Sequence, residues 1–226
     1  NSAGSSTEAV RVLYEDEHFL FVHKPAGVLV HRLANLVPRA DETILTDWLL
    51  AHYPEVRNVG DEPVLRPGIV HRLDRDTSGV MVVARSQQSF AYLKNLFQRH
   101  EVEKTYLSLV FGEPSSPSGV IDTAIALKRG SLRRATRGKN LRLPKEARTE
   151  YRTVARYEFR GTALTSLAVT PKTGRTHQIR VHLSSVGCPV VGDKIYGVTQ
   201  ERLRFAASLG VERQFLHADT IEFTDE

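Results

Sequence analysis

The residues best suited to chemistry lie in one stretch, residues 66–85, with the sequence RPGIVHRLDRDTSGVMVVAR. Its centre, residues 71–79, contains two Asp, two Arg, one His and a Thr-Ser pair. Short β-branched runs at residues 69–70 and 80–84 flank this centre and predict buried strands. Charged groups beside a hydrophobic core cost free energy unless they are paired or used. We therefore expect a polar loop at the edge of the core, which forms either salt bridges or a reactive site.

Asp74 is the strongest candidate for a reactive group, because it stands between Arg72 and Arg75. Nearby guanidinium charge favours an ionised carboxylate, which can act as a nucleophile, a base or a ligand. The spacing does not choose among these roles, and a turn residue in a salt bridge fits the pattern equally well. A glycosidase-like carboxylate pair with Asp76 is disfavoured, since adjacent loop acids rarely face one substrate.

The composition narrows the class of protein. Of the 226 residues, 41% are hydrophobic and 25% are charged, which is ordinary for a globular protein, and the net charge of +5 favours a polyanionic partner. The apolar runs are far shorter than a membrane span, and residues 1–9 are small and polar, as in a disordered tail. The single cysteine, Cys188, excludes an internal disulfide and favours a reducing, cytoplasmic setting.

Several common chemistries have no motif in this chain. There is no phosphate-binding P-loop, no dinucleotide-binding Gly-x-Gly-x-x-Gly and no Gly-x-Ser-x-Gly nucleophile turn. The histidines have neither Cys partners nor a His-Glu-x-x-His pattern, so we expect no zinc site.

The chain predicts an α+β fold in one domain over residues 10–226, because strands outnumber helices and are interspersed with them. A hairpin is expected over residues 10–22, and its second strand resumes at residues 28–31. Helices are expected over residues 43–53 with Thr43 as the N-cap, over residues 86–99 with Ser86 as the cap, and over residues 201–209. Further strands are expected at residues 103–110, 149–157, 163–171 and 215–223.

Four motifs resemble those of the RluA-type family of RNA pseudouridine synthases. Residues 71–79 resemble the family's signature motif, and Lys104-Thr105-Tyr106 resembles the second motif. Residues 174–182, followed by residues 187–193, resemble the third motif, and residues 24–27 resemble the opening turn. The matches keep the family's order from about residue 10 to residue 223, so we interpret the whole stretch as one synthase catalytic domain. The fold that this resemblance implies is a mixed, mainly antiparallel sheet flanked by helices.

The resemblance implies isomerisation of uridine in RNA without a cofactor or a metal. Asp74 then corresponds to the catalytic aspartate that attacks the flipped nucleotide, at the ribose C1′ or at the base. Tyr106 corresponds to the tyrosine that stacks on the base, and Arg180 to the basic residue that pairs with the aspartate. Arg72 corresponds to a residue that enters the RNA where the base leaves, since a base must leave the stack before chemistry on it.

Simpler structural interpretations remain for the supporting residues. Tyr106 also fits a core aromatic, and Arg180, which alternates with Ile179 and Val181, also fits an ion pair on a strand face. Thr77 and Gln178 are expected to orient backbone more than to touch RNA. The remaining candidates for RNA contact are His71 and Arg175, together with Lys128, Arg129, Arg133 and Arg134 in the basic segment.

The basic segment, residues 128–148, contains nine Lys or Arg residues against one acid, Glu146. With few aliphatic residues and two glycines, it predicts an exposed, mobile arm. Such a segment is by default a solvated surface, whereas beside an RNA substrate it would contact phosphates.

The first predicted strand begins near Val10, so we expect a catalytic domain without the S4-type module that many relatives carry. The expected partner is large-subunit ribosomal RNA or transfer RNA, and the protein is expected to act as a monomer away from membranes. Two other functions stay open: a catalytically silent RNA-binding or ribosome-assembly factor on the same fold, and a hydrolase that uses Asp74 and Asp76.

Overall fold

The computed structural model describes residues 9–32, 42–130, 133–139 and 141–224. The expected tail therefore lies, apart from Ala9, outside the described residues. The chain divides into two compact units, one formed by residues 1–102 and 221–226 and the other by residues 103–220. No helix within the described ranges is long and apolar enough to cross a membrane.

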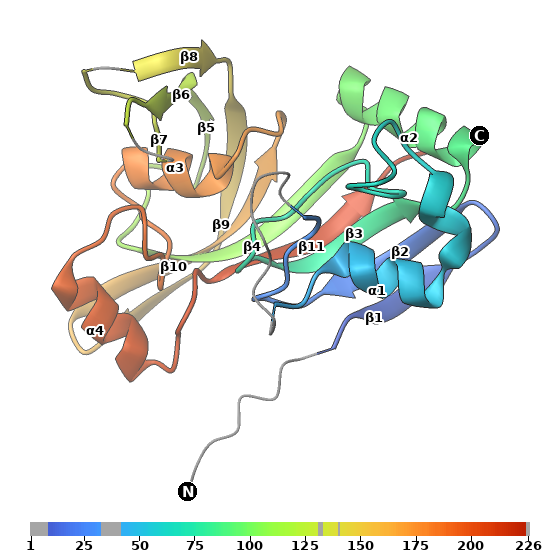
Figure 1. The fold of residues 1–226 in the computed structure, drawn as a ribbon. Helices are drawn as coiled ribbons and strands as arrows, with labels where there is room; N and C mark the ends of the chain where they lie inside the picture. Colours follow the sequence, from blue (N-terminus) through green and yellow to red (C-terminus); the bar gives the residue numbers. More distant parts are fainter. Residues whose placement is uncertain (1–8, 33–41, 131–132, 140, 225–226) are drawn as a thin grey trace, which may run out of the picture. The chain divides into compact units, whose positions relative to one another are not determined.

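The first unit contains three adjacent strands, which are β1 (Arg11–Glu15), β2 (Phe19–Lys24) and β3 (Ser78–Ala84) (Figure 1). Both strand pairs are antiparallel, so the predicted hairpin at residues 10–22 is confirmed. The helices are α1 (Leu45–His52) and α2 (Gln87–Arg99), with a 3-10 turn, η1 (Pro54–Asn58), after α1. Phe90 and Leu93 of α2 pack with Phe19, Val82 and Ala84 of the strands in one buried cluster.

Helix α2 begins and ends as its sequence predicts. The Ser86 hydroxyl accepts a hydrogen bond from the Ser89 N–H (3.1 Å), and the Ser89 hydroxyl accepts one from the Ser86 N–H (3.0 Å). This reciprocal capping box satisfies two backbone donors at the start of the helix. His100, with a φ of 59°, is the left-handed residue that ends the helix.

The sequence prediction around α1 is wrong in two details. Residues 28–31 form no strand; instead Leu29 makes one parallel bridge to Ile44. The Leu29 N–H donates to the Thr43 carbonyl (3.1 Å), and the Leu45 N–H donates to the Leu29 carbonyl (2.8 Å). Because this pairing keeps Ile44 extended, the helix begins at Leu45 and Thr43 does not cap it. Ile69 likewise forms a single bridge, to Val83.

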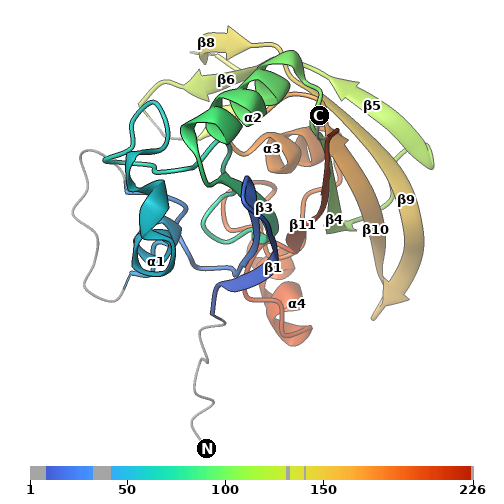
Figure 2. The same cartoon turned by 90° about the vertical axis from the view of Figure 1, so that its right-hand side faces the viewer.

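The second unit is built on strands in the order β11–β4–β10–β9–β5. Their bounds are β4 (Glu103–Phe111), β5 (Ser118–Asp122), β9 (Arg148–Phe159), β10 (Thr162–Pro171) and β11 (Leu216–Glu222), of which residues 216–220 belong to this unit. The pairs β4–β10, β9–β10 and β5–β9 are antiparallel, and Figure 2 shows the long strands β9 and β10 side by side. The predicted strand pair at residues 149–171 and the mainly antiparallel α+β fold are thus confirmed.

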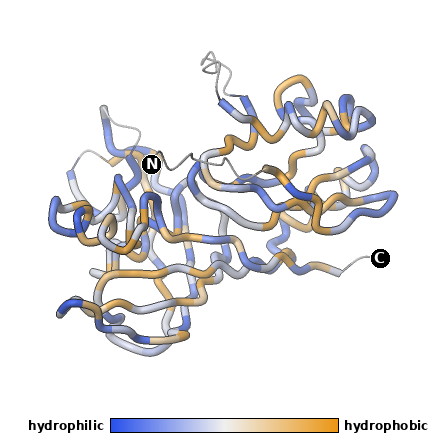
Figure 3. The backbone as a smooth tube through the Cα atoms, turned by 90° about the horizontal axis from the view of Figure 1, so that it is seen from below, coloured by the Kyte–Doolittle hydropathy of each residue, from blue (hydrophilic) through white to orange (hydrophobic). Residues whose placement is uncertain are grey.

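Two helices pack against this sheet. In α3 (Gln178–Ser185), Ile179 and Leu183 join a buried cluster that contains Val110 and Leu167. In α4 (Gln200–Ser208), Ala206 packs in a second cluster with sheet residues of β4 and β10. Apolar and polar stretches alternate along the chain in both units (Figure 3), as expected for elements that bury one face.

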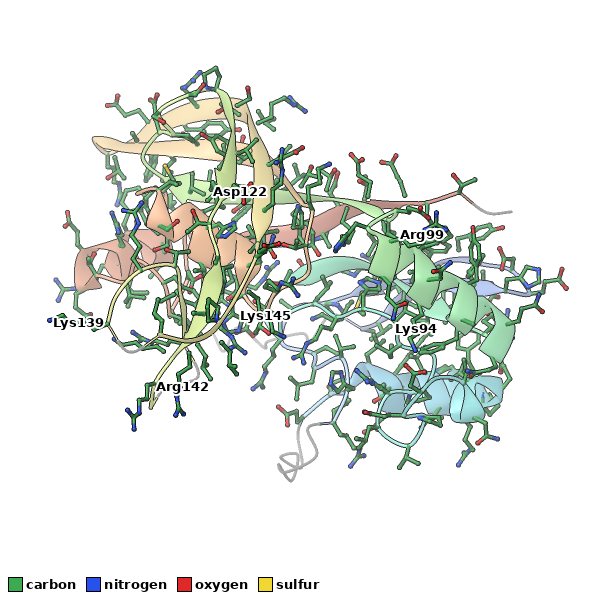
Figure 4. The ribbon with its side chains drawn as sticks, turned by 90° about the horizontal axis from the view of Figure 1, so that it is seen from above. Lys94, Arg99, Asp122, Lys139, Arg142 and Lys145 are labelled. Atoms are coloured by element: carbon green, nitrogen blue, oxygen red, sulfur yellow. The ribbon has the colours of Figure 1, made fainter. Side chains whose placement is uncertain are left out.

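The basic segment is not the unstructured arm that its composition predicts. Its described residues include β7 (Arg134–Ala135) and β8 (Leu141–Lys145), which pair with β6 (Ile125–Lys128) in a three-stranded sheet of order β7–β6–β8. We call this element the basic sheet. Ile125 is buried, so the first strand is attached to a core that the charge count did not indicate. The predicted exposure is confirmed for most cations, and Figure 4 shows Lys139 and Arg142 projecting outward.

Gly68 and Gly27 offer a matched test of the packing in the first unit. Both have positive φ, 68° and 85°. A Cβ at Gly68 would lie 2.6 Å from the Ala84 carbonyl oxygen, whereas at Gly27 it would meet no described atom within 4 Å. Gly27→Ala is expected to lower the free energy of unfolding by about 1 kcal/mol through backbone strain alone. Gly68→Ala is expected to cost about 3 kcal/mol, because the clash adds to that strain. Urea unfolding measures both, and equal losses would contradict the packing described here.

Candidate active site

The loop that carries Asp74 is fixed by a buried lysine of β2. Lys24 is fully buried, and its ammonium donates to the backbone carbonyls of Pro25 (2.8 Å), Val28 (2.9 Å) and Arg75 (2.9 Å). The Gly27 N–H donates to the same Arg75 carbonyl (3.0 Å). A buried ammonium is tolerated only when its donors are satisfied, so Lys24 holds the turn at residues 24–27 against the Asp74 loop.

Asp74 is half-buried, and the residues after it turn the chain directly into β3. Its carbonyl accepts a hydrogen bond from the Thr77 N–H (3.1 Å). Thr77 and Ser78 are buried, and Gly79 pairs with Lys24 in the β2–β3 register. The carboxylate is therefore presented from a short loop whose two ends are tied to buried strands, as expected for residues that set a turn.

The neighbours of Asp74 have distinct surroundings. Arg72 is exposed, which leaves its long side chain able to reach a partner. The Arg75 guanidinium is directed to the Gly27 carbonyl (3.2 Å) and to the Glu42 carboxylate (3.4 Å). Arg75 thus links the loop to Gly27 and Glu42, which lie elsewhere in the first unit.

His71 supports the loop from the side of β3. Its ring stacks on Phe97 (centroids 4.9 Å apart), and its Nε2 accepts a hydrogen bond from the Val82 N–H (3.1 Å). Because a backbone N–H can only donate, Nε2 carries no proton in this arrangement. The sequence prediction of an RNA contact through His71 stays a prediction beside this structural role.

Arg180 forms a buried ion pair in the second unit. Its Nε and Nη2 donate to the two carboxylate oxygens of Asp193 (2.7 and 2.9 Å), and both side chains are almost completely buried. The Asp193 Oδ1 also accepts the backbone N–H groups of Ile195 (2.8 Å) and Tyr196 (3.1 Å). Such a bidentate, hydrogen-bonded pair offsets the desolvation of both charges and fixes the plane of the guanidinium.

Arg180 lies on a helix and not on the strand face that its alternation with Ile179 and Val181 also fits. Ile179 packs in the cluster that contains Val110 and Leu167, whereas Val181 packs beside Ile125 of the basic sheet. Since residues 178–183 are all buried, apolar positions occur on several sides of the helix. Alternation therefore could not distinguish a strand from a helix here.

The pairing of Arg180 with Asp74 stays a prediction, because Asp74 belongs to the first unit and Arg180 to the second. The Asp193 pair uses Nε and Nη2.

Tyr106 lies on β4 opposite Val169 and is half-buried against the cluster that contains Ile179 and Leu183. Its ring is thus partly a core aromatic, as the simpler interpretation expects. Lys104 projects from the same face of β4, two residues away, and burial lowers the pKa of its ammonium.

Gln178 fixes the first residue of α3. Its Oε1 accepts from the Thr173 hydroxyl (2.7 Å) and the Arg175 N–H (3.0 Å), while its Nε2 donates to the Arg148 carbonyl and the Thr149 hydroxyl (both 3.0 Å). Four bonds use the full capacity of a side-chain amide. Gln178 therefore orients backbone, as expected. The Arg175 side chain is half-buried, and its Nε donates to the Glu146 carbonyl (2.9 Å).

Of the four candidates in the basic segment, Lys128, Arg129 and Arg133 are exposed on the basic sheet, while Arg134 is half-buried. The described residues contain no group of three or more His, Cys, Asp or Glu side chains that could hold a metal ion.

Two residues of the candidate site, Lys24 and Asp193, were not among the site residues predicted from the sequence. Both stand inside motifs that were recognised only as patterns, the opening turn and the end of the third motif.

His182 lies in α3, two residues after Arg180, and has polar partners although it is buried. It is fully buried; its Nε2 lies 2.9 Å from the Thr123 carbonyl and its Nδ1 lies 2.8 Å from the Thr149 hydroxyl. A carbonyl only accepts, so Nε2 carries a proton. Burial is the main cause that lowers the pKa of His182.

Replacing Lys24 tests how the Asp74 loop is held. Lys24→Met should lower the free energy of unfolding by about 3 kcal/mol, because three backbone carbonyls, two of them in buried contacts, lose a charged donor. It should also speed amide hydrogen exchange at Gly27 and Thr77. Lys94→Met is the matched control, since Lys94 forms an exposed pair with Asp61. Unchanged exchange at Gly27 and Thr77 would show that Lys24 does not fix the loop.

The lowered pKa of His182 makes the free energy of unfolding fall as the pH falls. Its folded pKa is below the unfolded value of about 6.5, so protons bind preferentially to the unfolded chain as the pH falls below that value. Between pH 7 and pH 5 the wild type should lose more free energy of unfolding than His182→Gln, by at most about 1.4 kcal/mol per pH unit. Parallel stability–pH curves for the two proteins, from urea unfolding at each pH, would contradict this assignment.

Comparison with known proteins places these features in a family context. The RNA pseudouridylate synthase family matches residues 18–185 of the chain. A protein of Aquifex aeolicus named an uncharacterized RNA pseudouridine synthase is 42% identical over 188 residues, which are 83% of this chain and 56% of the relative. Ribosomal large subunit pseudouridine synthase D of Nitrosomonas europaea is 38% identical over 229 residues, which are 99% of this chain and 61% of that protein.

A solved structure, human RNA pseudouridylate synthase domain containing 1, has a TM-score of 0.75 and 28% identity, and the match covers 98% of this chain and 81% of that one. This chain spans between about half and two thirds of the length of the curated relatives that it matches. The family match includes the Asp74 loop, Tyr106 and the residues of α3 up to Ser185. The chain belongs to the RNA pseudouridylate synthase family.

Proposed function

We propose that this chain catalyses the isomerisation of uridine to pseudouridine in RNA. The observation that carries the proposal is the presentation of Asp74. Its half-buried carboxylate stands on a loop held by the buried Lys24, next to the exposed Arg72. A nucleophile must be held in a fixed position to react, and this loop supplies that rigidity.

The isomerisation neither adds atoms to the nucleotide nor removes any from it, apart from the exchange of one proton. The bond between N1 of uracil and C1′ of the ribose breaks, the base turns, and a bond between C5 and C1′ forms. The proton on C5 leaves and N1 acquires one, so atoms and electrons balance without a redox partner. Asp74 supplies the nucleophile: a carboxylate oxygen bonds either to C1′ or to the base, and this bond breaks again before the product leaves, which restores the carboxylate.

The other residues have supporting roles in this proposal. The Tyr106 ring stacks on the extruded uracil, and Arg180 pairs with Asp74 to keep its carboxylate ionised. Arg72 enters the RNA and fills the place that the base leaves, for which a long planar cation is suited.

The proposed substrate is large-subunit ribosomal RNA or transfer RNA, taken up by a cytoplasmic monomer. The relatives named ribosomal large subunit pseudouridine synthase D support the ribosomal substrate. The cations of the basic sheet, with Lys128, Arg129, Arg133 and Arg134 among them, contact phosphates, which makes binding dependent on salt concentration. The exposure of most of these cations supports that role.

A silent RNA-binding factor on the same fold is the alternative. Such a protein has no chemical use for Asp74, Tyr106 and Arg180 together, so their joint presence favours the enzyme. A hydrolase that uses Asp74 and Asp76 would release free base or sugar, whereas an isomerase releases neither.

Asp74→Asn separates these possibilities, because it removes the nucleophilic charge and keeps the shape of the side chain. The assay measures tritium released from C5 of labelled uridine in large-subunit ribosomal RNA and transfer RNA transcribed in vitro. We expect about a 1,000-fold lower rate for Asp74→Asn, with RNA binding in a filter assay largely kept. Asp219→Asn, at an exposed position of β11, is the control and should keep the wild-type rate. Tritium release by Asp74→Asn at the wild-type rate, or free uracil released by the wild type, would contradict the proposal.

A further inference from the structure

Tyr196 joins the basic sheet to the start of α3. Its ring is 8% exposed and packs in a cluster with Ile125 of β6 and Val181 of α3. Its hydroxyl accepts a hydrogen bond from the backbone N–H of Arg134 in β7 (3.1 Å) and lies 2.9 Å from Nδ1 of His177. A buried phenol needs such partners, so one side chain fixes the relative position of two elements.

The same tyrosine contacts the Arg180 ion pair. The Arg180 guanidinium carbon lies 5.3 Å from the centroid of the Tyr196 ring, within the range of a cation–π contact. The Tyr196 backbone N–H donates to Oδ1 of Asp193, the oxygen that also accepts from Nη2 of Arg180. A displacement of Tyr196 therefore changes the surroundings of the guanidinium on two sides.

His177, which contacts the Tyr196 hydroxyl, has a strained backbone conformation. It has a φ of 58°, a left-handed conformation that is costly for a residue with a Cβ. It is the N-cap of α3, where its side chain forms no cap, and its imidazole meets the Tyr196 hydroxyl instead. Arg180 follows three residues later. The contact with Tyr196 thus helps to hold a backbone conformation that sets where α3 begins.

We propose that Tyr196 is a positioning residue that couples RNA binding on the basic sheet to the placement of Arg180. The inference rests on the proposed function, in which the basic sheet contacts phosphates and Arg180 acts on the catalytic carboxylate. RNA held by the sheet fixes β7, the Arg134 N–H fixes the Tyr196 hydroxyl, and Tyr196 fixes His177 and the guanidinium. Cations far along the sheet then contribute to the rate of the bound complex as well as to binding.

A tyrosine that only fills the core makes a different prediction. In that case the loss of its hydroxyl lowers stability, while neutralised cations on the sheet weaken binding and leave the rate of the saturated complex unchanged. The rate at saturating RNA is therefore the informative quantity.

The experiment is a double-mutant cycle with the full chain and [5-3H]uridine-labelled large-subunit ribosomal RNA or transfer RNA, whichever the wild type modifies. One change is Tyr196→Phe, which removes only the hydroxyl. The other is the combination Lys139→Gln, Arg142→Gln and Lys145→Gln, at three exposed positions of the basic segment. Single-turnover rates give the maximal rate and the RNA concentration at half-saturation, and the cycle measures their coupling. Tyr157→Phe, at an exposed tyrosine of β9, is the matched control.

Coupling predicts that the charge changes raise the half-saturating RNA concentration about tenfold and lower the maximal rate about fivefold. Tyr196→Phe alone should lower the maximal rate by about the same fivefold, and adding the charge changes should lower it no further. In the Tyr157→Phe background the charge changes should keep their full effect. If Tyr196→Phe fails to fold, His177→Gly replaces it, because glycine accepts the positive φ while the imidazole contact is lost.

Wild-type maximal rates for both Tyr196→Phe and His177→Gly, or effects that multiply in the cycle, would overturn the inference and leave the proposed function intact. An absence of tritium release by the wild type would overturn the proposed function, and this inference with it.

Discussion

A guanidinium group can be kept in a protein interior only if its charge and its donors are satisfied there. In the second unit Asp193 meets that requirement for Arg180, and its own carboxylate is completed by two backbone N–H groups. The pair is worth little as net stabilisation, since desolvation consumes most of the attraction between the charges. Its value is geometric, because a bidentate contact fixes the plane of the guanidinium. Arg180 of α3 is part of this pair, the Tyr196 N–H donates to Asp193, and the Tyr196 hydroxyl contacts the basic sheet through the Arg134 N–H.

The first unit also contains a buried cation, Lys24. Its ammonium donates to three backbone carbonyls and not to a carboxylate side chain, and these contacts hold the loop that carries Asp74. In the first unit a buried cation, Lys24, holds the loop of the candidate group, whereas in the second unit the buried cation, Arg180, is itself the candidate group. In the proposed function, Asp74 and Arg180 then act on the same nucleotide.

The sequence predicts those parts of the fold that local chemistry decides. The capping box of Ser86 and the hairpin at residues 10–22 were predictable, because they depend on neighbouring residues. The segments that failed depend on distant partners. Thr43 does not cap α1 because Leu29 keeps the preceding backbone extended, and the basic segment is ordered because Ile125 attaches it to a core. Neither contact leaves a periodic signal.

The candidate site shows the same division. Asp74, Tyr106 and Arg180 are site candidates that the motifs predict, whereas the helix that carries Arg180 was not predicted, since a helix buried on several sides has no single apolar face. Lys24 and Asp193 both belong to motifs that the sequence analysis recognised. Their role in holding other groups in place follows only from the atoms that they contact. Reasoning from residue types identifies groups that can react, while the groups that hold them in place require coordinates.

We propose that this chain makes pseudouridine in RNA, and a map of pseudouridine in all cellular RNA, from cells with and without the protein, is the decisive measurement. One or a few uridines in large-subunit ribosomal RNA or transfer RNA should lose the modification in cells without the protein. Restoring the wild-type protein should restore the modification, whereas Asp74→Asn should not. An identical map in both kinds of cell would rule out the proposed function.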